Sequence, residues 1–108
     1  MKPKKVVFVN RELEKSFNEI NENDPVKKAL IKAIKDLQED AFVGRNVKKK
    51  LIPRELVRKY GIKNLWIYNL PNAWRMFYSL TDSGEIEIVA AILDWMSHKE
   101  YERLFRFN

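Results

Sequence analysis

The hydrophobic pattern predicts a strand and two helices in the first third of the chain. Residues 5–9, KVVFV, form a short run of β-favouring residues. Asn10 is a good helix N-cap. The apolar residues after it recur at helical spacing, at Leu13, Phe17 and Ile20. Asp24 and Pro25 predict a second amphipathic helix, because aspartate caps a helix and proline fits its first position. Because the break between them is short, the two helices should form a helical hairpin.

The middle of the chain predicts a loop and one short helix. Residues 42–52, FVGRNVKKKLI, show no clear period and are expected to be a loop. Pro53 should begin a short helix that Gly61 ends, because glycine readily adopts the left-handed conformation found at helix C-termini. The residues of this helix expected to face the core are Leu56, Val57 and Tyr60.

The last part of the chain predicts a β-meander followed by a helix. Ser97 and Glu100 match a capping box that starts a helix of about two turns. Turn sequences, LPNA and TDSG, separate three β-rich runs. The expected strands are residues 64–70, 73–81 and 85–95. The order β-α-α-(α)-β-β-β-α predicts an α+β domain whose helices pack on one face of a small, mainly antiparallel sheet.

Composition restricts the possible classes of function. The 108 residues should form one domain, residues 1–108, and 45% of them are apolar, which is enough for a core. A net charge of +6 and a pI of about 9.6 favour a polyanionic partner, either nucleic acid or an acidic protein segment. The lack of cysteine excludes disulfides and thiolate chemistry. A single histidine leaves no standard zinc cluster, so neither a metal nor a cofactor is expected.

The chain shows no signal for a membrane. No apolar run reaches the roughly 18 residues that a membrane span needs. The N-terminal stretch MKPKKVVFVNRELEK lacks a long apolar region and a small-residue cleavage site, so it does not match a signal peptide. We therefore expect a cytoplasmic protein without a membrane partner.

Alternation along the strands groups the candidate binding residues. Arg75 shares a strand face with Phe77, two residues on. If the first turn of the meander centres on residues 71–72, Tyr68 pairs opposite Arg75 and Trp66 opposite Phe77, all on one face. The residues then pointing towards the helices are Leu65, Ile67, Met76 and Tyr78. The Arg75 face is also apolar, so it should be either covered or used.

This arrangement has a functional and a structural interpretation. A second turn centred on residues 82–83 places the small Ala90 beside Arg75 and leaves room for a ligand. Trp66 and Tyr68 could then offer a platform on which nucleic-acid bases stack. In the structural alternative, Arg75 pairs with a carboxylate such as Asp94 at the sheet edge, and the two aromatic residues pack in the ordinary way.

Two further clusters carry candidate chemistry. His98 should occupy the first position of the last helix, where the positive helix end disfavours its protonated form and suits it to acid–base work. The alternative is an ordinary surface histidine. The run Lys48, Lys49 and Lys50 could contact phosphates, although charge runs in loops are commonly just solvated.

Three stretches together resemble the RelE/ParE superfamily of toxins from type II toxin–antitoxin modules. They are NLWIYNLPNAWRMFYSL, the β-rich run after it, and the ending HKEYERLF. The chain is most similar to the RelE and HigB-like ribonuclease branch, most clearly over residues 51–107. The resemblance implies a single RelE-like toxin domain: an N-terminal strand, a two-helix hairpin, a three-stranded antiparallel meander and a short C-terminal helix.

The resemblance also implies an activity and partners. Toxins of this branch inhibit translation as metal-free endoribonucleases that cut mRNA in the decoding site of the ribosome. The ribose 2′-hydroxyl attacks the adjacent phosphate, the 5′-oxygen leaves, and a 2′,3′-cyclic phosphate results. The implied partners are mRNA, the ribosome and a cognate antitoxin, a small acidic protein encoded by an adjacent gene.

The resemblance assigns roles to individual residues. Arg75 matches the strand arginine that holds the scissile phosphate. His98, or Lys99 beside it, falls where relatives place a terminal basic or histidine residue, and Tyr101 falls near the tyrosine that stacks on or orients the substrate. The candidate RNA-binding residues are Lys48, Lys49, Lys50, Arg54, Trp66 and Tyr68.

The chain departs from the family on one strand. Relatives carry basic residues on the strand before the arginine, where this chain has Trp66 and Tyr68. The general base would then be His98, or Lys50 or Arg54 from the loop, or the activity has been lost. Two alternatives therefore stay open: a ParE-like toxin that inhibits DNA gyrase, and a non-catalytic RNA- or protein-binding domain of the same fold. The terminal His/Lys/Tyr cluster favours the ribonuclease over the gyrase inhibitor.

Overall fold

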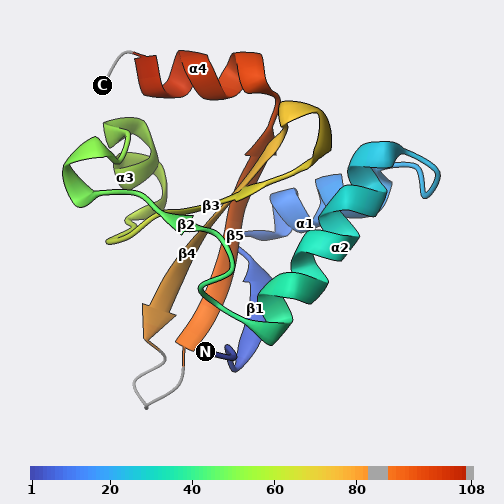
Figure 1. Ribbon diagram of the computed structural model, residues 1–108, viewed down its shortest axis with the longest axis horizontal. Coiled ribbons are helices and arrows are strands. Elements are labelled where there is room, and N and C mark those ends of the chain that lie inside the picture. The colour runs from blue at the N-terminus through green and yellow to red at the C-terminus, as the bar shows by residue number, and fades with distance from the viewer. Residues whose placement is uncertain (83–87, 107–108) are drawn as a thin grey trace.

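The computed structural model describes residues 1–82 and 88–106, which fold into a five-stranded mixed sheet with four α-helices (Figure 1). The α+β class is therefore confirmed. The strands are β1 (Lys5–Phe8), β2 (Arg45–Asn46), β3 (Trp66–Asn69), β4 (Arg75–Asp82) and β5 (Ile88–Met96). The helices are α1 (Arg11–Glu19), α2 (Pro25–Glu39), α3 (Arg54–Tyr60) and α4 (His98–Arg106), with single 3₁₀ turns η1 (Lys49–Leu51) and η2 (Pro71–Ala73).

Helix ends lie where the local sequence signals predicted them. The side chain of Asn10 accepts a hydrogen bond from the backbone nitrogen of Leu13, 2.8 Å away, at the start of α1. Asp24 caps α2 in the same way, with Pro25 as its first residue. Gly61 ends α3 with φ of 64°, a conformation that other residues adopt at a cost. The Ser97–Glu100 capping box is also present at α4.

The sheet has the strand order β1-β5-β4-β3-β2. The predicted antiparallel meander of β3, β4 and β5 is confirmed, and the N-terminal strand β1 runs parallel to β5. The expected loop at residues 42–52 is wrong in part, since it contains the edge strand β2 and the turn η1. In the predicted second turn, Thr81 and Asp82 belong to β4, while residues 83–87 lie outside the described part of the chain.

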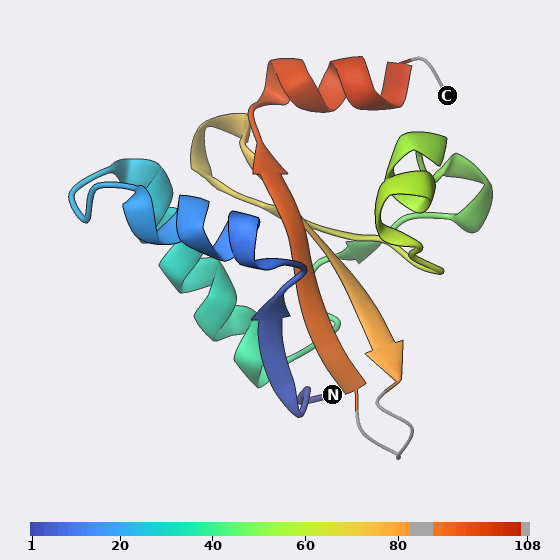
Figure 2. The ribbon, with the colours of Figure 1, turned by 180° about the vertical axis from the view of Figure 1, so that it is seen from behind.

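Helices cover both faces of the sheet, which corrects the expectation that they would pack on one face. Figures 1 and 2 show α1 and α2 on one side and α3 on the other, with α4 across one end. One core cluster joins α2 to the sheet through buried residues that include Leu37, Met76 and Tyr78. The other contains Leu56 of α3 with Phe77, and residues of α4 pack against it. Val57, expected in the core, is 41% exposed on the outside of α3.

The register between β3 and β4 differs by one residue from the expected one. Arg75 pairs with Asn69, and Trp66 pairs with Tyr78. The connection is the three-residue turn η2, in which Asn72 and Ala73 both have positive φ. This turn contains one residue more than the predicted two-residue turn. Because side chains alternate along a strand, a one-residue slip moves every β3 side chain to the opposite face.

The slip has three direct consequences. Trp66 and Tyr68 lie on the α2 side of the sheet, away from the face of Arg75. Leu65 and Ile67 lie with Phe77 in the core under α3 and α4, whereas both had been expected to point with Met76. The neighbour of Arg75 on β5 is Met96; Ala90 pairs with Leu80 at the far end of the strand.

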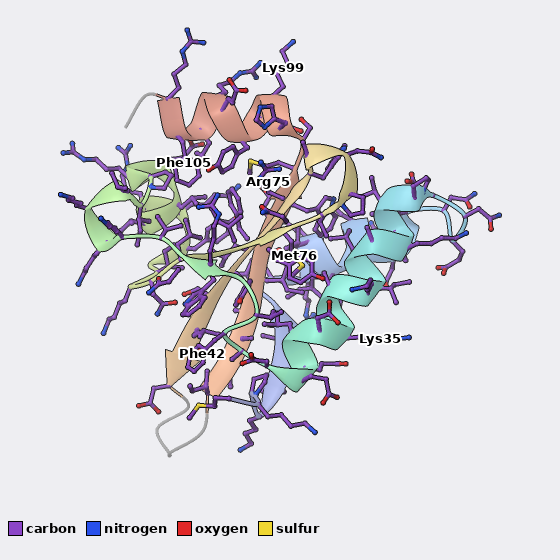
Figure 3. All side chains as sticks on the ribbon, in the orientation of Figure 1. Lys35, Phe42, Arg75, Met76, Lys99 and Phe105 are labelled. Atoms are coloured by element: carbon purple, nitrogen blue, oxygen red, sulfur yellow. The ribbon has the colours of Figure 1, made fainter. Side chains whose placement is uncertain are left out.

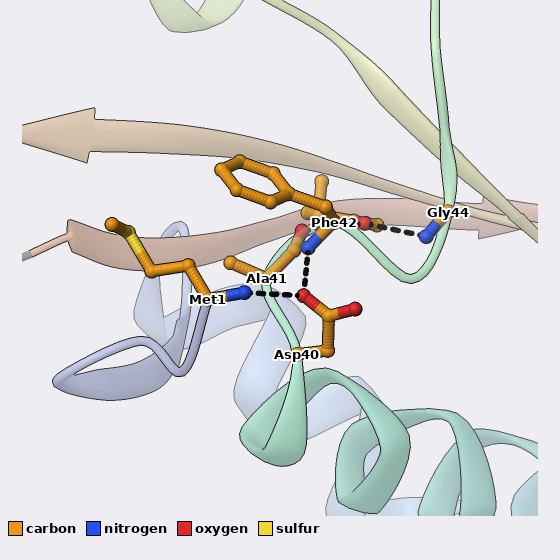
Figure 4. Close-up of polar contacts among 6 residues, drawn as sticks. Met1, Asp40, Ala41, Phe42 and Gly44 are labelled. Atoms are coloured by element: carbon orange, nitrogen blue, oxygen red, sulfur yellow. Dashed lines mark hydrogen bonds and ion pairs between the residues drawn. The ribbon is translucent and has the colours of Figure 1, made fainter.

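Several hydrogen bonds hold the segment between α2 and β2 in place, and they determine where β2 begins. Figure 4 shows Asp40 accepting hydrogen bonds from the Met1 amino group, at 2.8 Å, and from the Phe42 nitrogen, at 2.9 Å. The pKa of Asp40 is lowered, first by its bond to that amino group. The buried hydroxyl of Tyr78 donates to the Ala41 oxygen and accepts from the Gly44 nitrogen, both at 2.9 Å.

Candidate functional site

Arg75 is the first residue of β4, at the end of the sheet where α4 begins (Figure 3). The centre of its guanidinium group lies 4.9 Å from the ring centroid of Tyr101, a cation–π distance. Its Nη1 donates to the backbone oxygen of Trp74 at 3.3 Å, while its buried Nε has no hydrogen-bond partner within the described residues. A buried donor without a partner costs free energy, so this arginine gains from a ligand that can accept its hydrogen bonds.

The predicted alternative partner of Arg75 is engaged elsewhere. Asp94 stands opposite Phe77, and in the described part of the chain it makes no ion pair with Arg75. Its Oδ1 accepts from the Trp95 nitrogen at 2.8 Å. It lines a groove of about 520 Å³ between α3 and α4, and burial there raises its pKa. The structural ion pair between Arg75 and Asp94 is therefore not found.

Tyr101 of α4 connects the parts of the site. Its hydroxyl accepts a hydrogen bond from Nη2 of Arg45 at 3.0 Å. Its ring packs on Phe105, with centroids 4.8 Å apart, and edge-on against Phe77 at 6.2 Å. Because these contacts belong to the core under α4, the tyrosine has a fixed position between the two arginines.

Arg45 was not among the predicted site residues, because its segment was taken for a loop without period. It enters the site as the first residue of β2, paired with Ile67 of β3. The preceding Gly44 is needed for this approach, since a Cβ there would lie 2.7 Å from the Ile67 backbone oxygen and 2.8 Å from the Tyr78 hydroxyl. The sequence signal that could have found Arg45 is this glycine, because such close approach of two backbones is a known reason for glycine.

The two other α4 candidates lie differently. The His98 ring lies nearly parallel to that of Tyr101, with centroids 6.3 Å apart, and its Nε2 pairs with Glu102 one turn on. His98 is half exposed, so it borders the site from the solvent side. Lys99 points away from the body of the protein, above α4 in Figure 3. Of the two basic residues at this position, only His98 joins the group around Tyr101.

Trp66 and Tyr68, predicted as a base-stacking platform beside Arg75, are part of the opposite side. Trp66 stacks between Phe42 and Tyr78, at centroid distances of 5.3 and 6.1 Å. Tyr68 donates to Asp36 of α2 at 2.5 Å. Burial and then this bond raise the pKa of Tyr68, and the same bond lowers that of Asp36. Both aromatic residues thus pack against α2 as in the structural alternative.

The remaining RNA-binding candidates lie on η1, directly before it, and on α3. The side chains of Lys48, Lys49, Lys50 and Arg54 are all exposed, outside the core that holds this segment against the sheet. The described residues contain no group of three His, Cys, Asp or Glu side chains placed to hold a metal ion. They also contain no helix that is long and apolar enough to cross a membrane.

The arrangement supplies cationic hydrogen-bond donors and an aromatic hydroxyl at one point of the surface. Two guanidinium groups, from β2 and β4, approach the same tyrosine, and neither pairs with a carboxylate of the described residues. Arginine suits bidentate binding of phosphate oxygens. Because Tyr101 accepts from Arg45, its own hydroxyl proton stays free for another acceptor. Comparisons with protein-family models, curated proteins and solved structures gave no match.

Proposed function

We propose that this protein is the toxin of a type II toxin–antitoxin module and acts as a ribosome-dependent, metal-free endoribonuclease on mRNA. The observation that carries the proposal is the convergence of Arg45 and Arg75 on Tyr101, with a buried Arg75 nitrogen that has no partner within the described residues. Such a site is suited to a phosphate group beside a ring. The resemblance of the meander and the C-terminal helix to RelE-like toxins supports the same choice of reaction.

In the proposed reaction, Arg75 and Arg45 hold the non-bridging oxygens of the scissile phosphate. Negative charge grows on these oxygens as the 2′-hydroxyl attacks, so fixed cations stabilise the transition state more than the ground state. The bond from phosphorus to the 5′-oxygen breaks, and a 2′,3′-cyclic phosphate and a free 5′-hydroxyl result. Tyr101 and His98 are the nearby groups able to donate to the leaving oxygen or accept the attacking proton.

The decisive experiment compares Arg75→Ala with the wild type in a translation extract that contains ribosomes and a defined mRNA. Losing a fixed cation of this kind typically costs roughly 10²–10³ in rate. Cleavage by the wild type should leave 2′,3′-cyclic phosphate and free 5′-hydroxyl ends, the products of the proposed transfer. Lys35→Ala, on the exposed side of α2, is the matched control. Equal cleavage by a well-folded Arg75→Ala protein would refute the site.

One observation favours binding without cleavage as a second candidate. In the observed register Asn69 stands opposite Arg75, and Trp66 and Tyr68 face α2, so β3 offers no acid–base group to the site. A gyrase-inhibiting toxin, or a silent RNA- or protein-binding domain, would need only the cationic surface. Supercoiling by purified gyrase, measured with and without the protein, separates the first of these from the ribonuclease.

The proposal includes partners and a location. A small acidic antitoxin from an adjacent gene would neutralise the site in a cytoplasmic complex, and mRNA on the ribosome would be the substrate. Expression of the chain alone should stop growth, and co-expression of the acidic neighbour should restore it. Normal growth with intact mRNA at high soluble yield would count against the toxin and leave the silent binding domain.

A further inference from the structure

The charge of this protein is concentrated in one short segment. Residues 48–63 contain seven lysine and arginine residues and one glutamate, a net charge of +6 that equals the net charge of the whole chain. The other residues balance, with 14 cationic and 14 acidic side chains. The cationic residues of the segment are Lys48, Lys49, Lys50, Arg54, Arg58, Lys59 and Lys63. We call residues 48–63, which comprise η1, α3 and the loop after it, the basic lobe.

The basic lobe is rigidly attached, and its charges all point outward. Ile52 and Leu56 are 8% and 4% exposed and anchor the lobe in the core under α3 and α4. All seven cationic residues, by contrast, are exposed. In Figures 1 and 2 the lobe stands on the opposite side of the sheet from α1 and α2. The fold therefore presents a fixed, outward-facing group of cations.

Most of these cations form no ion pair with a carboxylate in the part of the chain that the structure describes. No ion pair with a carboxylate of the described residues involves Lys48, Lys49, Lys50, Arg58 or Lys63. On α2, by comparison, Lys32 pairs with Asp36 at 3.0 Å and Lys27 with Glu22 at 3.5 Å. Clustered like charges repel one another and favour an anionic ligand that spans several of them.

We propose that the basic lobe is a docking surface for the phosphate backbone of double-helical RNA, separate from the Arg75–Tyr101 site. The lobe offers cations without an exposed aromatic ring, since its one tyrosine, Tyr60, is half-buried. A surface of this kind contacts phosphates and offers no exposed aromatic platform for unpaired bases. A duplex displays its phosphates outward and hides its bases, so it matches the lobe. Only the choice of RNA over DNA rests on the proposed function.

The test measures binding, independently of any cleavage. A fluorescent RNA duplex of about 16 base pairs is titrated with the protein over a range of salt concentrations. Replacing Lys49 and Lys50 by glutamine should weaken binding roughly tenfold or more at about 0.15 M salt. It should also reduce the slope of log K against log salt by about 2. The matched control replaces Lys28 and Lys35, exposed on α2, and should leave both quantities unchanged.

Further arms separate the proposal from its competitors. Binding that is tighter to single-stranded RNA or to duplex DNA than to duplex RNA would overturn the assignment. An acidic protein partner would instead use the exposed Leu51 and Val57, which are 54% and 41% exposed.

Replacing Leu51 and Val57 by threonine should therefore leave duplex binding unchanged, and polyglutamate should compete poorly with the duplex. A loss of binding in that double variant, or competition as strong as by RNA, would overturn the choice of ligand. Thermal unfolding of each variant checks the fold. Absence of cleavage by the wild type would refute the proposed function and leave the duplex measurement intact, so the two failures are distinguishable.

Discussion

Tyr78→Phe removes one oxygen that holds the start of β2 in place. The side chain of Tyr78 is fully buried, and its hydroxyl donates to the Ala41 oxygen and accepts from the Gly44 nitrogen, each at 2.9 Å. The substitution leaves the ring and its packing unchanged and creates no large cavity. Both backbone groups, however, lose the hydrogen-bond partner they have in the protein interior, so the effect on stability isolates these two bonds.

The expected loss of stability follows from the two bonds. A hydrogen bond contributes about 0.5–1.5 kcal/mol net, and a buried group left unsatisfied costs about 1–3 kcal/mol. Ala41 is fully buried, whereas the Gly44 bond is only partly buried, so we place the sum at about 2–3 kcal/mol. Urea unfolding of both proteins at pH 7, followed by circular dichroism, measures the difference.

The same substitution should also show a dependence on pH. Burial raises the pKa of Tyr78 to about 12, from an ordinary value of 10.0. Between pH 10 and pH 12 the unfolded chain has released a proton that the folded protein keeps. The contribution of this group to the stability of the fold is therefore complete below pH 10 and is lost as the pH rises through 12. This difference in pKa corresponds to roughly 3 kcal/mol. Phenylalanine cannot ionise, so the gap between wild type and Tyr78→Phe should narrow above pH 10.

Two results would contradict this account. One is a Tyr78→Phe protein within about 0.5 kcal/mol of the wild type at pH 7, the range typical of surface substitutions. The other is a stability difference that stays constant between pH 7 and pH 11. Tyr60→Phe is the matched control, because Tyr60 lies half-buried at the end of α3 and its change should stay within that range.

Three further substitutions test other parts of the structure. Lys27→Met removes a buried ammonium group that donates a hydrogen bond to the Phe17 backbone oxygen at 2.5 Å. The free energy of unfolding in urea should fall by about 1–3 kcal/mol. A more stable variant would show that the cost of burying the charge exceeds the contribution of this hydrogen bond. Gly44→Ala places a methyl group 2.7 Å from a backbone oxygen of β3 and should lower the melting temperature; an unchanged melting temperature would contradict the close approach. Tyr68→Phe removes the hydrogen bond that lowers the pKa of Asp36. This bond stabilises the folded state above pH 3.8, and its contribution is lost as the pH falls below that value. The free energies of unfolding of wild type and variant should therefore converge in acid, and a difference that stays constant with pH would refute the linkage.

The helix boundaries were predictable because their signals are local. Asn10, Asp24 with Pro25, and Ser97 with Glu100 each act on backbone groups within three residues, so the sequence alone contains both partners of the bond. The antiparallel meander was predictable for a similar reason, since consecutive β-rich runs with short connections pair with one another.

The register and the second helical layer were not predictable in the same way. The turn η2 takes three residues because Asn72 and Ala73 adopt positive φ, and nothing in the letters LPNA distinguishes this from a two-residue turn. Apolar residues on both sides of the strands indicated that the second face is either covered or used, but that pattern does not say that a helix covers it. Arg45 was not predicted as a site residue, because a strand of two residues is too short to show an alternation of apolar and polar positions.

The one-residue register decides what chemistry the proposed site can use. With Tyr68 opposite Arg75, β3 would have supplied a ring and a hydroxyl; with Asn69 there instead, it supplies a neutral amide. The cationic and hydroxyl groups around Arg75 then come from β2 and α4, through Arg45 and Tyr101. Because α4 packs on the sheet through Tyr101 itself, the position of this helix determines where Tyr101 lies relative to Arg75. A change that shifts α4 should therefore alter the proposed phosphate binding at Arg75 even without contacting this arginine.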